Sequence, residues 1–360
     1  MLAEPMTDPD GEAARVWWHS WEAVALVAAG TAVGIRIARG RRPRTAPPDP
    51  DALRQISWLG RRLDPYPAAA DPGLAFPALP PGQVVGVPDR GEMFVRVARR
   101  EEGDGIPILL LHGWMATADL NWFLLYEALS GRHTVIAPDL RGHGRGIRSP
   151  RPFTIEDCAD DVAGLLRRLG IEKAVAVGYS MGGPVALELW RRHRELVAGL
   201  VLEATGLQFS STPLQQTAWR MLGVGGVLLR WPTGRMVLFR LGGALREIPD
   251  ELLAYRGWAD GEFRRNDPLE VVEAGRALSR FDARPFARSV DVPTSVVVTT
   301  GDRMVPPSEQ RALAEATGAR VFEFDADHSA VAVRPREFAE VTLEAVAAVL
   351  PEAEEAADSA

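Results

Sequence analysis

The chain has a single cysteine, Cys158, among its 360 residues. One thiol forms no internal disulfide and has no partner thiols for a metal cluster, so a disulfide scaffold is excluded and a reducing compartment is favoured. Nothing near Cys158 in the sequence would activate its thiol, and we interpret it as a packing residue at a helix start. No cluster with metal-ligand spacing is visible, and we expect no metal and no other cofactor.

Basic stripes and internal repeats are also missing. The net charge is −7, which argues against a nucleic-acid-binding protein. Hydrophobic residues make up 46% of the chain, enough for a large core. The length allows one large domain with additions, or two domains.

A segment near the N-terminus resembles a membrane span. Residues 1–15 are acidic and unpatterned, and we expect them to be disordered; residues 16–35 are mostly apolar, begin with tryptophans and precede five arginines. A cleavable signal peptide carries its positive charge first, so residues 16–38 are instead predicted to be a membrane-anchor helix with the rest of the chain on the cytoplasmic side. The alternative is a soluble helix or a disordered extension of a cytoplasmic protein, because the apolar centre, Ala23–Ile35, is short.

Prolines are concentrated in residues 39–82, which predicts a semi-rigid linker. The last residues, 351–360, are acidic and rich in alanine, and we expect a disordered tail.

From residue 83 onward the pattern is that of an α/β fold. Gln83–Val87 and Glu92–Ala98 predict a strand pair, and apolar strand patterns then alternate with helical ones. The further strands are expected at 108–111, 134–137, 174–177, 197–202, 294–300 and 320–324, and the helices at 119–129, 155–169, 184–193, 308–317 and 335–350. This order predicts an eight-stranded, mostly parallel sheet with helices on both faces.

The alternation is interrupted between residues 206 and 289. This segment has no clear strand and several helical stretches rich in Leu, Met, Trp and Arg. We therefore divide the fold into a first core part at 83–205, a helical cap or lid at 206–289 and a second core part at 290–350.

Ser180 is the candidate nucleophile. It is the central residue of a G-x-S-x-G pentapeptide between Gly178 and Gly182, directly after the apolar run 174–177 and before a helical pattern. A tight strand-to-helix turn of this kind strains the central residue and lifts its side chain out of the sheet, and the flanking glycines leave room for nearby backbone.

An activated serine needs a base, and His328 is selected by elimination. It alone follows the last predicted strand, in a short loop before the final helix. Parallel sheets place functional side chains at the carboxyl ends of their strands, where Ser180 also lies. The remaining histidines lie in the anchor, on the opposite edge, at the far end of a helix or in loops that fit a structural role: His19, His133, His193, His112 and His143.

The base needs a carboxylate to orient it, and Asp302 is the best candidate. It follows the strand at 294–300 and gives the chain order Ser180, Asp302, His328. Glu203, at the end of an earlier strand, is the competing acid.

Serine attack creates an oxyanion that needs two preorganised donors. The backbone N–H of Met181, directly after the serine, is one candidate. The other is the N–H of Trp114 in the loop after the strand at 108–111, a loop that His112 and Gly113 are expected to shape.

Five motifs in this order resemble the α/β-hydrolase superfamily, in particular its lidded, esterase-like group. They are Leu110–Trp114, Pro138–Gly144, Gly178–Gly183, Gly301–Pro306 and Asp327–His328. The resemblance covers residues 83–350 and implies that the Asp139–Gly144 loop is structural. A serine nucleophile sets the chain apart from the haloalkane dehalogenase and epoxide hydrolase branches. Asp327 stands where glycine is common in the family.

These features predict a serine hydrolase that cleaves a small-molecule carboxylic ester with an apolar acyl or alkyl group. Lactone, amide or carbon–carbon bond hydrolysis and cofactor-free perhydrolysis are alternatives on the same residues. From another class, a non-catalytic ligand-binding or membrane-tethered interaction module stays open. The oligomeric state is left open.

Fractionation without detergent tests the predicted anchor. We expect the full-length chain in the membrane fraction and a chain beginning at Pro81 in the soluble fraction, because only the former carries residues 16–38. A full-length chain that remains entirely soluble would remove the anchor.

Overall fold

The computed structural model describes residues 77–98, 105–131, 133–149, 151–210, 219 and 255–350. The predicted disordered N-terminus, the anchor at 16–38, most of the linker and the tail at 351–360 lie outside these residues, as does much of the predicted cap. In the described part, no helix combines the length and apolar character needed to cross a membrane.

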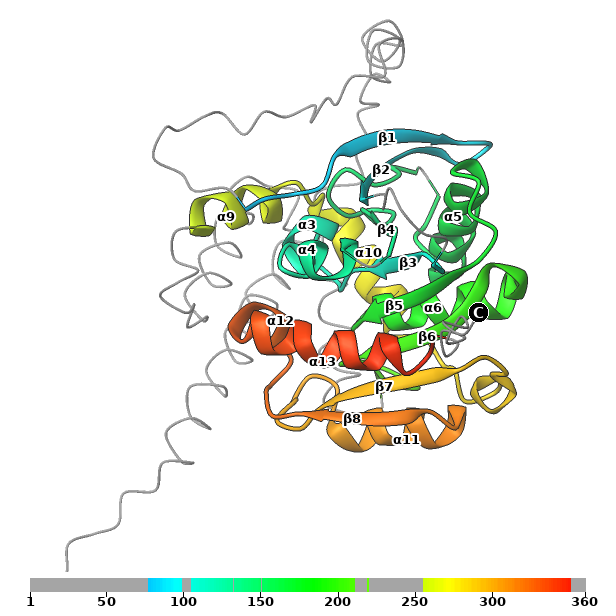
Figure 1. Ribbon diagram of the computed structural model, residues 1–360. Helices are drawn as coiled ribbons and strands as arrows, with labels where there is room; N and C mark the ends of the chain where they lie inside the picture. The colour runs from blue at the N-terminus through cyan, green and yellow to red at the C-terminus, as the bar shows by residue number, and fades with distance from the viewer. Residues whose placement is uncertain are drawn as a thin grey trace, which may run out of the picture.

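The predicted eight-stranded, mostly parallel sheet is confirmed. Its strand order is β1-β2-β4-β3-β5-β6-β7-β8 (Figure 1). Strand β2 runs antiparallel to β1 and β4, and all other neighbours are parallel. The strands are β1 (Gly82–Val87), β2 (Gly91–Ala98), β3 (Ile108–Leu111), β4 (Val135–Pro138), β5 (Ala174–Tyr179), β6 (Val197–Glu203), β7 (Thr294–Thr299) and β8 (Arg320–Phe324).

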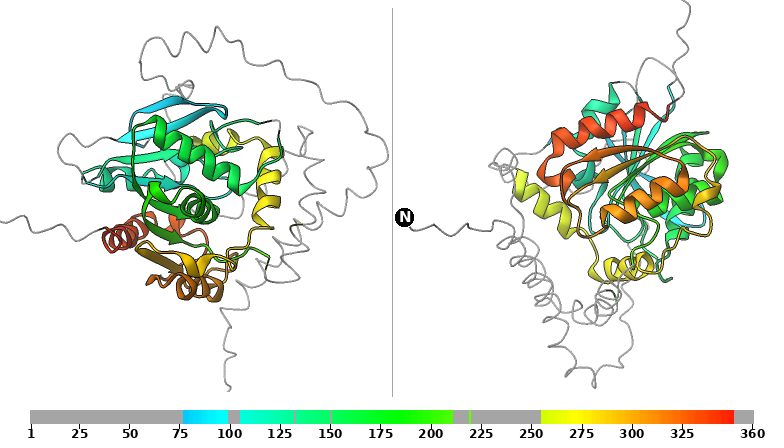
Figure 2. Two further views of the ribbon diagram at one scale, coloured as in Figure 1. Left: turned by 90° about the vertical axis from the view of Figure 1, so that its right-hand side faces the viewer. Right: turned by 90° about the horizontal axis from the view of Figure 1, so that it is seen from below.

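Helices cover both faces of the sheet. One face carries α3 (Ala118–Trp122), α4 (Leu125–Ser130) and α13 (Pro335–Ala347), and the other carries α5 (Ile155–Arg168), α6 (Gly182–Arg192) and α11 (Pro307–Thr317). Figure 2 shows α13 and α11 on opposite sides of the sheet. Two short 3-10 turns, η1 (Arg194–Leu196) and η3 (Ala287–Ser289), precede β6 and β7.

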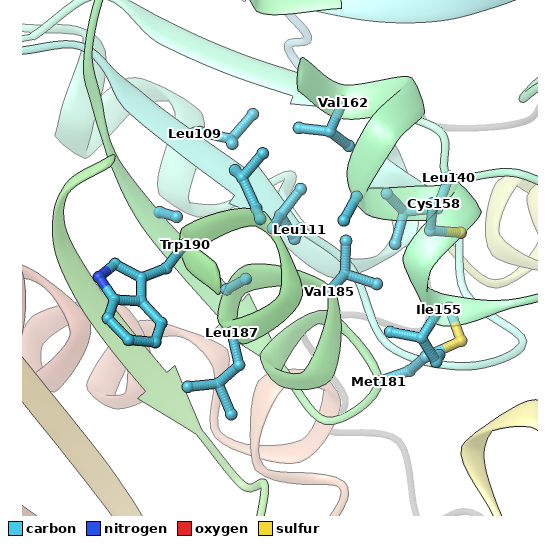
Figure 3. Close-up of a cluster of buried hydrophobic side chains, with 14 of the residues drawn as sticks. Leu109, Leu111, Leu140, Ile155, Cys158, Val162, Met181, Val185, Leu187 and Trp190 are labelled. Atoms are coloured by element: carbon cyan, nitrogen blue, oxygen red, sulfur yellow. The ribbon is translucent and has the colours of Figure 1, made fainter. Parts of the chain in front are cut away.

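Side-chain alternation along the central strands builds two cores. Leu109 and Leu111 of β3 pack into the cluster beneath α5 and α6, whereas Ile108 and Leu110 pack into the cluster beneath α4 and α13. All four are fully buried, as expected for a parallel strand covered on both faces. Cys158 lies in the first cluster (Figure 3), and burial raises the pKa of its thiol well above the ordinary value.

The structure corrects two predicted elements. The helix expected at 119–129 is two helices, α3 and α4, separated by a turn at Phe123–Leu124 without proline or glycine. Phe123 packs against Tyr255 and Trp258, so the turn brings this side chain against residues of the predicted cap segment. The expected loop between His328 and the final helix contains a short helix, α12 (Ala330–Val333).

The described part of the predicted cap contains α9 (Arg256–Arg264) and α10 (Pro268–Leu278). Helix α10 begins at a strong local signal, because Asp267 accepts hydrogen bonds from the N–H groups of Leu269 and Glu270 and Pro268 follows as the first helical residue. Helix α9 packs on α3 and helix α10 on α5. Both helices therefore rest directly on the α/β core.

Candidate active site

Ser180 occupies a strained turn between β5 and α6. Its φ angle is +51°, a left-handed conformation that is uncommon for a residue with a side chain. A Cβ atom at Gly178 would lie 2.4 Å from the carbonyl oxygen of Gly182, and one at Gly182 would lie 2.0 Å from that of Leu111. Only glycine fits at these two positions, so the turn requires the glycines that flank Ser180 in the sequence.

Three side chains from distant segments meet at this turn. The Nε2 atom of His328 lies 2.9 Å from the Oγ atom of Ser180. On the other side of the ring, Nδ1 lies 2.7 Å from Oδ2 of Asp302. The serine is 6% exposed and the aspartate 3%, so both ends of the hydrogen-bonded chain are buried.

The carboxylate of Asp302 is held by donors on both oxygens. Oδ1 accepts the N–H groups of Met304 and Val305 at 2.8 and 2.9 Å. Oδ2 accepts the hydroxyl of Thr299 and the side-chain amide of Gln310, besides facing His328. These hydrogen bonds fix the orientation of the Asp302 carboxylate, and the fixed carboxylate in turn orients the imidazole of His328.

The backbone of His328 is also fixed. The hydroxyl of Tyr179, next to the serine, donates to the carbonyl oxygen of His328 at 2.6 Å. Asp327, at the position where glycine is common in the family, accepts the N–H of Ser329 at 2.7 Å. The aspartate thus stabilises the turn that carries His328.

Glu203 does not face His328. Its Oε1 atom accepts the hydroxyl of Thr342 at 2.6 Å, and the side chain is fully buried. Burial raises its pKa to about 8, opposed only by the Thr342 hydrogen bond. Two histidines that the sequence does not favour as the base form contacts elsewhere: His193 contacts Asp160, and His143 contacts the carbonyl of Arg141.

His112 determines the orientation of the peptide that precedes Trp114. Its Nε2 atom accepts the N–H of Leu140 at 2.9 Å, so Nδ1 carries the proton and donates to the carbonyl oxygen of Gly113 at 2.8 Å. Burial lowers the pKa of His112, which keeps the ring neutral in this tautomer. The Gly113 carbonyl and the Trp114 N–H belong to one planar trans peptide and point in opposite directions.

The two predicted oxyanion donors are available. A Cβ at Gly113 would lie 3.4 Å from Cβ of Ser180, so the loop after β3 runs beside the serine. Within the described part of the chain, neither the N–H of Trp114 nor that of Met181 has a hydrogen-bond partner. Met181 is the N-cap residue of α6, where the helix dipole adds positive potential.

Sequence reasoning missed several side chains that hold this loop. Asn121 accepts the N–H of Gly113 at 3.0 Å, and Thr117 caps α3 through the N–H of Leu120. Thr117 could have been found as a helix-start signal, whereas nothing local marks Asn121. Among the described residues, no group of three or more His, Cys, Asp or Glu side chains could hold a metal ion.

Comparison with known families agrees with this architecture. A model of the alpha/beta hydrolase fold matches residues 106–335, well over half of the chain. The chain belongs to the α/β-hydrolase fold family. The matched range includes Ser180, Asp302 and His328.

Individual relatives of this α/β hydrolase are distant. AB hydrolase superfamily protein YisY of Bacillus subtilis is 26% identical over 57% of this chain and 77% of that protein. Matches at 36–38% identity are shorter and span 32–46% of the curated proteins concerned. Any activity named for those proteins belongs to longer chains than the matched segments.

Two solved structures resemble the whole core. The enol-lactonase from Burkholderia xenovorans LB400 has a TM-score of 0.63 and 26% identity, and covers 74% of this chain and 100% of its own. The thermophilic esterase from Thermogutta terrifontis has a TM-score of 0.60 and 27% identity, and covers 75% of this chain and 99% of its own.

The raised pKa of Glu203 predicts a pH-dependent stability. The unfolded carboxyl loses its proton near pH 4.5 and the folded one near pH 8. The contribution of Glu203 to the free energy of unfolding is therefore greatest below about pH 4.5. It then falls by up to ~1.4 kcal/mol per pH unit until the folded group titrates. Glu203→Gln removes this titration, so its melting temperature should change less than that of the wild type between about pH 5 and pH 9. Parallel pH curves for the two proteins would contradict the assignment.

Proposed function

We propose that this protein is a serine hydrolase that cleaves carboxylic esters by acyl transfer to water. The observation that carries the proposal is the continuous hydrogen-bonded chain from Ser180 through His328 to Asp302. Nucleophile, base and orienting acid follow one another at hydrogen-bond distance, as this chemistry requires.

Each side chain has one role in the proposed reaction. The hydroxyl of Ser180 attacks the ester carbonyl while Nε2 of His328 takes its proton. Asp302 holds the ring through Nδ1 and stabilises the imidazolium. His328 then gives the proton to the leaving alkoxide, which leaves an acyl group on the serine, and a water molecule deprotonated by the same histidine releases the acid.

The N–H groups of Met181 and Trp114 would bind the oxyanion. Both lie beside Ser180, one directly after it and one on the loop after β3. Their directions are fixed before substrate binds, because Met181 begins α6 and the peptide before Trp114 is oriented by His112. Preorganised backbone donors of this kind are worth several kcal/mol in the transition state.

The aromatic residues around the cap support an apolar substrate. Phe123 packs against Tyr255 and Trp258, and Trp114 packs against Trp219. The resemblance to an esterase favours an open-chain ester, and the resemblance to an enol-lactonase favours a lactone as the second candidate. A membrane anchor at residues 16–38, proposed from sequence alone, would place this site near lipid-derived esters.

Turnover of p-nitrophenyl esters of graded chain length tests the proposed function. We expect measurable turnover, higher for apolar acyl chains, and a loss of at least about 10³-fold in Ser180→Ala because the nucleophile is removed. Tight ligand binding without turnover in either protein would instead favour a non-catalytic module.

A matched pair of variants tests the acid. Asp302→Asn presents an amide N–H₂ or carbonyl to His328 and favours the wrong tautomer, so kcat should fall about 10³–10⁴-fold. Glu203→Gln should keep kcat within a few-fold, because Glu203 binds Thr342 rather than the imidazole. Equal losses in the two variants would argue against Asp302 as the orienting acid.

A further inference from the structure

We propose that Asn266, in the segment between α9 and α10, is a positioning residue for the oxyanion hole. It acts by holding the loop that carries the Trp114 N–H. The inference rests on the proposed function and extends it, because it gives a residue of the predicted cap segment a role in positioning an oxyanion donor.

Asn266 bridges two loops of the α/β core. Its Nδ2 atom donates to the carbonyl oxygen of Met115 at 2.8 Å, in the loop after β3. Its Oδ1 atom accepts the N–H of Gly144 at 2.8 Å, in the loop after β4. A further bond from Nδ2 to the carbonyl of Phe263 at 3.1 Å anchors the side chain to the end of α9. The amide uses both its donor and its acceptor groups, so its orientation is defined by its partners.

The loop that Asn266 holds is strained. Met115 has a φ angle of +66°, and it directly follows Trp114. A left-handed residue with a side chain costs on the order of 1–3 kcal/mol and persists only where its surroundings hold it. The N–H of Ala116 donates to the carbonyl of Gly113 at 3.2 Å and closes the turn. The Gly113 carbonyl and the Trp114 N–H belong to the same planar peptide, so the direction of one sets the direction of the other. Relaxation of the backbone at Met115 would therefore turn the oxyanion donor away from its position.

Two further contacts connect the same loop to the cap. The indole N–H of Trp114 donates to the carbonyl of Val271 in α10 at 2.7 Å, and its ring lies against Gly275. Thr117 donates to Glu262 in α9 at 3.1 Å. These two contacts hold residues on either side of Met115. Of the three contacts to the predicted cap, the one from Asn266 is made to the strained residue itself.

Asn266→Asp is the sharpest test, because it keeps size and shape. It retains the acceptor for Gly144 but replaces the donor with an oxygen that faces two carbonyl oxygens, Met115 and Phe263. We expect kcat on a p-nitrophenyl ester to fall about 10–100-fold with KM within about 3-fold, since removal of a whole donor costs about 10²–10³-fold. Arg276→Gln, at an exposed position in the last turn of α10, is the matched control and should keep both parameters.

A trifluoromethyl ketone separates positioning from general damage. Ser180 adds to its carbonyl carbon, His328 takes the hydroxyl proton, and the resulting hemiketal oxygen carries a negative charge in the oxyanion hole. Its inhibition constant should rise in Asn266→Asp by the same factor by which kcat falls, whereas the corresponding alcohol, which forms no adduct, should bind as to the wild type. If Asn266→Asp fails to fold, Asn266→Ser, whose side chain is too short to bridge both loops, takes its place.

Wild-type kcat in a folded Asn266→Asp protein would overturn the inference, as would a change confined to KM or an equal loss in Arg276→Gln. Undiminished turnover in Ser180→Ala would instead overturn the proposed function itself, so the two failures are distinguishable.

Discussion

The left-handed backbone of Ser180 is the constraint on which the site depends. Two hydrogen bonds hold it: the N–H of Ser180 donates to the carbonyl of Glu203 at 2.8 Å, and its carbonyl accepts the N–H of Gly183 at 3.0 Å. The first bond continues the pairing of β5 with β6, and the second begins α6. One strained residue therefore aims the hydroxyl at His328 and lies directly before the N-terminus of α6.

A buried ionic network supports the loop after β3, which runs beside Ser180. Asp139 accepts the N–H of Ala118 at 2.8 Å and pairs with Arg145 at 2.9 Å, and Arg145 also pairs with Asp119. Although burial opposes ionisation, the pull of Arg145 lowers the pKa of Asp139. Because Ala118 begins α3, this network fixes the point where the loop after β3 ends. Breaking one partner of such a buried pair is costly, so the network holds the loop firmly.

Much of this arrangement could be predicted from the sequence. Fully apolar strands such as Ile108–Leu111 and the glycines around Ser180 are local signals, and the sheet topology brings strand ends together, so Ser180, Asp302 and His328 could be grouped without coordinates. Side-chain contacts between loops, which the order of the strands does not bring together, could not be predicted. Asn266 reaches Met115 across 151 positions, and no local pattern in either segment marks the pairing. The split between α3 and α4 could not be predicted for a similar reason. No proline or glycine marks the turn, and Phe123 packs against the distant residues Tyr255 and Trp258.

Covalent labelling by a fluorophosphonate, followed by mapping of the modified residue, tests the central claim most directly. The reagent needs an activated nucleophile, a base to receive its proton and donors for the phosphoryl oxygen, and so it depends on the assembled site rather than on a chosen substrate. We expect a single label on Ser180 that disappears in Ser180→Ala and forms much more slowly in His328→Ala. A label on another residue, or no label on a folded chain, would contradict it.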